Sequence, residues 1–215
     1  MELIDKQDNS AQSAPWKGRP PKNDEEARAR IIRAARACIK RDGVTGANIS
    51  AVAKQVGVTR RTIYRLFDST GQLIQTIVAQ WSGVTLNKML THVNNYSSFQ
   101  ERVVEAIIYL RKAIRKDSFL KVYFSTDSAN GKQVSITDTF TPESLELSFQ
   151  MLKVLYPHDA REIDQELFRQ LAEHMQRILF SLVLTPSLST DSDSALREYL
   201  NNWLTPAVDA LLESR

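Results

Sequence analysis

The sequence predicts an all-α protein of about nine helices. After residue 22, almost every apolar stretch has the three- and four-residue spacing of an amphipathic helix, and no stretch shows the clear alternation of a strand. Helix-start signals, in which Asn or Ser stands three residues before Glu or Gln, recur at Asn23, Ser69 and Ser98. A chain of 215 residues is long enough to bury a sizeable core.

The pattern divides the chain into three parts. Residues 1–22, rich in Ser, Gln, Asn and Pro, predict a flexible basic arm. Residues 23–68 predict a unit of three helices, and residues 69–215 predict a larger helical domain. We expect helices at 23–43, 49–56, 59–67, 69–93, 98–114, 117–125, 141–157, from Asp159 to about residue 184, and from about residue 195 to the end with a kink at Pro206.

Charge is distributed unevenly along the chain. Residues 17–65 hold 13 Lys and Arg against 4 Asp and Glu, whereas residues 81–215 hold 14 against 17. A compact basic end next to a mildly acidic remainder favours a polyanionic partner, with nucleic acid as the first candidate.

Several protein classes are not predicted. The one cysteine, Cys38, excludes an intramolecular disulfide, and its place on an apolar helix face predicts a core residue. Residues 1–15 lack the apolar segment of a signal peptide, and no stretch approaches the roughly 18 apolar residues of a membrane span. We therefore expect a cytoplasmic protein that does not contact a membrane.

Catalytic and metal-binding patterns are missing as well. The three histidines His92, His158 and His174 are isolated, without a second His or Cys at a ligand spacing. The sequence has no Gly-rich phosphate loop and no G-x-S-x-G motif. We expect no metal, no cofactor and no enzymatic activity.

The strongest functional signal is the run ISAVAKQVGVTRRTIYRLF over residues 49–67. Two short helices joined by a tight turn at Gly57 are typical of a helix-turn-helix, whose second helix enters the major groove of DNA. Its outward side chains offer donors for bases and phosphates. They are Arg60, Arg61, Thr62, Tyr64 and Arg65. The alternative is a solvated basic helix on an ordinary helical bundle.

The run from Ala53 to Phe67 resembles the signature of the TetR family of transcriptional regulators, approximately I-A-x-x-A-G-V-S-x-G-T-L-Y-x-x-F. The resemblance covers residues 23–78 and implies DNA contacts from Asn48, Ser50, Thr59 and Thr70 in addition to the five outward residues of the second helix. Three positions depart from the pattern. Asn48 stands where Thr is usual. Arg61 stands where Gly is frequent and Thr70 where Lys is frequent, so the operator sequence is not inherited from other members.

The arm carries a weaker signal. In residues 16–22, WKGRPPK, Arg19 lies in a thin, extended basic segment of the kind that enters a narrow A·T-rich minor groove. The alternative is a basic tail that adds only nonspecific attraction.

The resemblance implies that the C-terminal domain binds an effector and forms a homodimer through the last two helices. Their wide apolar stripes, which include large aromatic residues, agree with such an interface or with packing inside one chain. The candidate pocket residues are Trp81, Tyr109, Phe119, Tyr123, Phe124, Phe149 and Met175. Because no charged residue is expected in the interior, the predicted effector is apolar or aromatic.

Together these observations predict a homodimeric repressor that a small molecule releases from an approximately palindromic, double-stranded DNA operator. An activator of the same fold fits the sequence equally well. A helical binding module with an acidic partner is the third reading, and sensitivity of bound nucleic acid to salt distinguishes it from the others.

Overall fold

The computed structural model describes residues 15–43, 48–123, 140–156, 164–185, 187 and 190–213, and all the regular secondary structure in this part of the chain is helical. The all-α prediction is confirmed. A short 3-10 helix precedes ten α-helices. They are η1 (Pro15–Gly18), α1 (Asp24–Asp42), α2 (Ile49–Val56), α3 (Arg60–Tyr64), α4 (Thr70–Val93), α5 (Phe99–Lys116), α6 (Ser118–Tyr123), α7 (Pro142–Leu155), α8 (Gln165–Leu184), α9 (Asp193–Trp203) and α10 (Thr205–Glu213).

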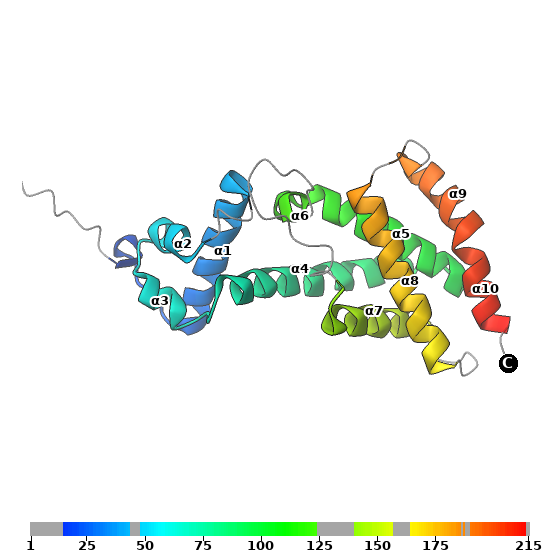
Figure 1. Ribbon diagram of the computed structural model, residues 1–215, viewed down its shortest axis with the longest axis horizontal. Helices are drawn as coiled ribbons and strands as arrows, with labels where there is room; N and C mark the ends of the chain where they lie inside the picture. The colour runs from blue at the N-terminus through cyan, green and yellow to red at the C-terminus, as the bar shows by residue number, and fades with distance from the viewer. Residues whose placement is uncertain are drawn as a thin grey trace, which may run out of the picture.

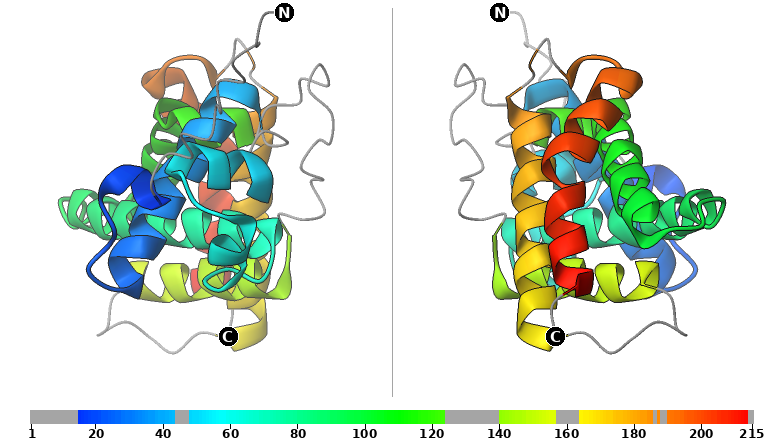
Figure 2. Two further views of the ribbon diagram at one scale, coloured as in Figure 1. Left: turned by 90° about the vertical axis from the view of Figure 1, so that its left-hand side faces the viewer. Right: turned by 90° about the vertical axis from the view of Figure 1, so that its right-hand side faces the viewer.

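Helices α1 to α3 form one end of an elongated molecule, and α4 leads from them into the remaining helices (Figure 1). Helix α5 is central to this second part, where it packs against α4, α7, α8, α9 and α10. Helices α8 and α10 lie side by side at the end of the molecule opposite α1 to α3, which the right-hand view of Figure 2 shows.

Side-chain caps set the beginnings of most helices, as the sequence predicts. The side chains of Asn23, Asn48, Thr59, Ser69 and Ser98 each accept a hydrogen bond from a backbone N–H in the first turn. At Ser98 the reciprocal bond is also present, because the backbone N–H of Ser98 donates to the carboxylate of Glu101, so this cap is a complete capping box.

The C-terminal helices differ from the prediction in two places. The helix expected to bend at Pro206 is divided into α9 and α10 at Leu204, because Pro206 has no N–H to donate and cannot continue the hydrogen bonds of α9. Helix α8 is capped by Asp164, whose side chain accepts from the N–H groups of Glu166 and Leu167. The expected cap Asp159 lies outside the described residues.

The hydrophobic core of the N-terminal unit does not end at residue 68, where we expected a domain boundary. Leu73 and Ile77 of α4, together with Phe119 and Leu120 of α6, are buried in the same cluster as the residues of α1 to α3. Helix α6 also contacts α1. The helix-turn-helix therefore shares its core with the beginning of α4 and with α6.

A single carboxylate supports this junction. One oxygen of Asp117 accepts from the N–H groups of Phe119 and Leu120 at the start of α6, at 2.9 and 3.1 Å. The other accepts from the guanidinium of Arg36 in α1 at 2.8 Å. The same guanidinium lies 5.1 Å from the centre of the Phe119 ring. Asp117 thus caps α6 and fixes it to α1 at once.

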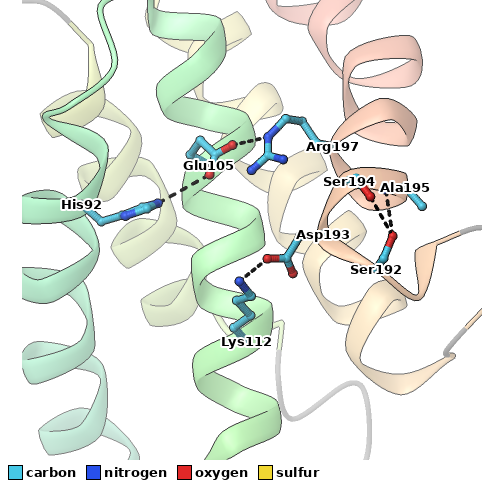
Figure 3. Close-up of polar contacts among 8 residues, drawn as sticks. All are labelled: His92, Glu105, Lys112, Ser192, Asp193, Ser194, Ala195 and Arg197. Atoms are coloured by element: carbon cyan, nitrogen blue, oxygen red, sulfur yellow. Dashed lines mark hydrogen bonds and ion pairs between the residues drawn. The ribbon is translucent and has the colours of Figure 1, made fainter.

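A second buried carboxylate links three helices of the larger core. Glu105 of α5 is about 4% exposed and accepts from Arg197 of α9 at 2.5 Å, with His92 of α4 at 3.5 Å on its other oxygen (Figure 3). Burial alone would raise the pKa of Glu105, but Arg197, with smaller contributions from His92 and Tyr96, lowers it overall. The ionised form is therefore the stable one in the folded protein.

We predict that Glu105→Gln lowers the free energy of unfolding at pH 7 by about 1–2 kcal/mol, since Arg197 then loses its charged acceptor but stays partly solvated. Because the folded pKa is lowered, the stabilisation exists above the unfolded pKa of about 4.3 and disappears as the pH falls through the folded value. Urea unfolding of both proteins at pH 7 and in acid measures this, and the difference must shrink in acid. Glu198→Gln, at an exposed position on α9, is the control.

None of the helices in the described ranges is both long enough and apolar enough to cross a membrane.

Candidate DNA-binding surface

The turn between α2 and α3 has the backbone geometry of a helix-turn-helix. Gly57 ends α2 in the left-handed region, with φ 79° and ψ 44°, and its N–H donates to the carbonyl of Ala53 at 2.9 Å. The N–H of Val58 donates to the same carbonyl at 2.9 Å. Val52 and Ile63, one from each helix, are fully buried beneath the turn. This turn therefore directs α3 away from α2 with its apolar face inward.

Helix α3 presents the predicted reading side chains to solvent. Arg60 and Arg61 are exposed, and within the described part of the chain neither forms an ion pair. Tyr64 is 52% exposed, although it is a large aromatic residue. The neighbouring Ile63 is fully buried and anchors the helix. An exposed Tyr beside two free guanidinium groups is suited to phosphate and base-edge contacts.

The other predicted residues of α3 and its caps contact groups of the same chain. Thr59 caps the helix, and its hydroxyl lies 3.1 Å from that of Thr62. Arg65 forms an ion pair with Asp24 at 2.9 Å, and both side chains are about 60% exposed. An ion pair this exposed contributes little to stability, so Arg65 can exchange Asp24 for a phosphate at small cost.

Three more predicted residues lie at helix beginnings. Asn48 accepts from the N–H of Ala51 and caps α2, where Ser50 is exposed in the first turn. Thr70 is the first residue of α4 and is partly exposed. Free N–H groups at a helix N-terminus favour an anion, so each position is chemically suited to a phosphate.

Residues 15–22 were expected to be part of a flexible arm, but they lie against the helix-turn-helix. The N–H of Trp16 donates to the carbonyl of Gly57 at 2.8 Å, and the indole packs against the buried cluster below. The carbonyl of Arg19 accepts from the side chain of Arg30 in α1. The sequence analysis did not predict that Trp16 anchors this segment. A large apolar residue in an otherwise polar segment is the feature that could have indicated it. The remaining arm residues, 1–14, lie outside the described ranges.

The backbone at this anchor is unusual. Trp16 and Lys17 have φ values of 60° and 54°, which residues with a side chain seldom adopt. A Cβ placed on Gly57 would lie 3.1 Å from Cγ of Lys17 and 3.3 Å from its backbone nitrogen. The absence of a side chain at Gly57 therefore serves both the turn and the docking of the arm.

The predicted pocket residues lie in two different cores. Trp81, Phe119 and Tyr123 belong to the core shared with the helix-turn-helix, where Phe119 and Tyr123 stack at 5.7 Å. The others lie in the larger core around α5. They are Tyr109, Phe149 and Met175. Phe124 is outside the described residues. The described residues of the set are thus not gathered around a single cavity.

An open groove of about 420 Å³ lies between α8 and α10. It is lined by Leu167, Gln170, Leu171, His174, Ala207, Ala210 and Leu211. Of the aromatic residues on the last helices, Phe168 packs inside the chain near Phe99, whereas Trp203 is 71% exposed.

The described ranges contain no group of three His, Cys, Asp or Glu side chains placed to hold a metal ion.

Comparison with known proteins agrees with this geometry. Residues 31–77 match the family model described as bacterial regulatory proteins, tetR family. The fold is similar to that of the TetR family repressor AlkX from Dietzia sp. strain DQ12-45-1b, implicated in biodegradation of n-alkanes, with 16% identity over 86% of this chain and 97% of that chain and a TM-score of 0.62. A Mesorhizobium loti MAFF303099 protein assigned to the TetR family is 15% identical over 89% of this chain and 98% of that chain, with a TM-score of 0.50. No curated protein matches significantly.

The N-terminal part of the chain thus has the helix-turn-helix fold of bacterial transcriptional regulators, with an exposed recognition helix. The predicted resemblance to the TetR family is confirmed, and the chain has the DNA-binding fold of that family.

We predict that Gly57→Ala destabilises the protein by about 1–2 kcal/mol, because Ala is unfavourable at positive φ and its Cβ would crowd Lys17. Gly83→Ala is the matched control. Gly83 lies in the interior of α4 with no atom within 4 Å of an added Cβ, so this change should stabilise by about 0.5–1 kcal/mol. Thermal unfolding of both variants measures the contrast, and equal effects would contradict the role assigned to Gly57.

Proposed function

We propose that this protein is a homodimeric repressor that binds a palindromic operator and leaves it when a small effector binds the larger domain. The observation that carries the proposal is the exposure of Arg60, Arg61 and Tyr64 on a recognition helix whose opposite face is buried. The ten predicted DNA contacts lie in three places. Arg19 follows η1, three residues lie at the starts of α2 and α4, and the other six belong to α3 or cap it.

Specificity is assigned to the two guanidinium groups and position on the duplex to the remaining contacts. An Arg in the major groove can donate two hydrogen bonds to a guanine, whereas hydroxyl groups and helix N-termini bind phosphate. Arg61 replaces the Gly that is frequent in the family, so it adds a side chain where many members have none. This chain is therefore expected to read an operator of its own.

We predict that Arg61→Ala and Tyr64→Ala each weaken binding to the DNA flanking the protein's own gene. Loss of a base contact costs about 1–3 kcal/mol, or roughly 5- to 150-fold in affinity. Arg61→Ala should also relax sequence preference, whereas Tyr64→Ala should weaken all sequences alike. Fluorescence anisotropy across a range of salt concentrations measures both effects, with Lys88→Ala on the exposed surface of α4 as the control.

Binding that is weak, equal for any DNA and indifferent to both substitutions would contradict the proposal. In that case the helix-turn-helix would be a scaffold, and a helical module with an acidic protein partner would become the better reading.

The groove between α8 and α10 supports dimerisation through the last helices. Its lining is mostly apolar, with Ala207 and Ala210 small enough to allow a close approach, and Leu167 is 39% exposed. Two such helices from each protomer would form a four-helix interface. A twofold dimer also presents two recognition helices, which matches the symmetry of a palindromic site.

We predict that Ala210→Arg converts the protein to a monomer, because a charged side chain would be buried against the partner without a counter-ion. Ala79→Arg, the same substitution at an exposed position of α4, should leave the dimer intact. Sedimentation velocity distinguishes the two states. A dimer that persists in Ala210→Arg at micromolar concentration would place the interface elsewhere.

Effector control is supported by the core that the helix-turn-helix shares with α6. Because α6 directly follows α5, a rearrangement of α5 by a bound ligand would act on α1 through Asp117, Arg36 and Phe119. Helix α4 reaches from the reading end to the larger core and offers a second connection. Both routes change the position of α3 relative to its counterpart in the dimer.

A further inference from the structure

The larger core contains a buried guanidinium group, two of whose nitrogens have no hydrogen-bond acceptor in the described part of the chain. Arg111, in the middle of α5, is only 3% exposed. Within the described chain, its Nε and Nη2 groups are fully buried and donate to no acceptor. A guanidinium group remains protonated in proteins, so the fold cannot remove this charge by titration. Burial lowers the pKa of Arg111, which shows the same unfavourable desolvation.

Glu105, six residues earlier on α5, shows how this fold treats a buried charge that has a structural role. Its carboxylate is as deeply buried as Arg111 and has Arg197, His92 and Tyr96 as partners. Buried charges are normally paired, since an unpaired one costs the full loss of its hydration. The contrast on one helix indicates that Arg111 is kept for a partner other than its own chain.

The charged groups around Arg111 do not balance one another. Arg115 lies one turn further along α5, and Asp191 and Asp193 lie at the start of α9. The carboxylate of Asp193 is already bound to Lys112, as Figure 3 shows. Three cations therefore face two carboxylates, an excess of a single positive charge.

The remaining surroundings are apolar. Ile107, Ile108 and Ile114, at three or four residues from Arg111, share its face of α5 and are buried. The C-terminal part of α8 approaches here, because the carbonyl of Leu182 accepts from Arg115 at 3.5 Å. Arg111 thus lies between an apolar face of α5 and the charged groups of Arg115, Asp191 and Asp193.

We propose that Arg111 is the anion-binding group of the effector site, and that the effector is a small monocarboxylate with an apolar body. The planar guanidinium can bind the two oxygens of a carboxylate with parallel hydrogen bonds, and one negative charge balances the local excess. The inference rests on the proposed effector control. The expectation of an apolar or aromatic effector had as its premise an interior without charged residues, and this premise is wrong at Glu105 and Arg111.

The test compares carboxylates with their uncharged amides on the full-length protein. The probes are octanoate with octanamide and benzoate with benzamide, and the readouts are calorimetric binding and the midpoint of thermal unfolding. At about one hundred times its Kd, a carboxylate should raise the wild-type midpoint by roughly 5–10 °C. The amides and inorganic phosphate should leave it unchanged.

Two variants make the assignment specific to Arg111. Arg111→Met keeps the length of the side chain and removes the charge, so it should abolish the shift while unfolding at the same or a higher temperature than the wild type without ligand. Arg111→Lys keeps the charge but not the planar fork and should bind about tenfold more weakly. Lys116→Met, at an exposed position of α5, should retain the shift.

Carboxylate binding that is unchanged in both Arg111 variants, equal stabilisation by amide or phosphate, or no carboxylate binding by the wild type would each overturn the assignment. A lower unfolding temperature of Arg111→Met without ligand would also do so, because it would show that Arg111 stabilises the core. Operator binding is measured separately on the same samples without probes. Its absence would contradict the proposed function and leave the carboxylate result standing.

Discussion

The carboxylate of Asp117 carries the connection between the two ends of this molecule. One of its oxygens accepts from the N–H groups of Phe119 and Leu120 in α6, and the other accepts from Arg36 of α1. If either bond were missing, the short helix α6 would lose its beginning or its attachment. The buried ring of Phe119, held below Arg36, depends on both. The recognition helix takes its orientation from α1 and α2, so its position also depends on this junction.

This arrangement makes the helix-turn-helix part of a larger packed body. A core that includes α4 and α6 resists independent motion of the reading end, because interiors are close-packed and respond to displacement as units. A change at α5 is therefore passed on as a movement of helices and is not absorbed by a linker. Coupling of this kind needs no long pathway, since α5 and α6 are adjacent in sequence and α6 touches α1.

The sequence predicts local features of this protein well and distant ones poorly. The caps at Asn23, Ser69 and Ser98 and the turn at Gly57 were predictable because each depends on residues within a few positions. The exposed face of α3 follows from the same short-range pattern. By contrast, the pairing of Arg36 with Asp117 joins residues 81 positions apart, and nothing in helical spacing specifies it. For that reason the sequence does not predict that residues on both sides of residue 68 share one core.

The buried charges of α5 also could not be predicted from local sequence, and they carry information about function. Glu105 and Arg111 occur in a run whose apolar spacing marks a core helix, so periodicity alone assigns them to solvent or leaves them unexplained. Packing from α8, α9 and α10 places both inside. Once inside, their fates differ, because α9 supplies Arg197 to Glu105 while Asp193 at its start is occupied by Lys112. Helix α5 thus pairs one buried charge, whereas Nε and Nη2 of Arg111 have no acceptor in the described chain, and an unsatisfied group is where a ligand gains most from binding.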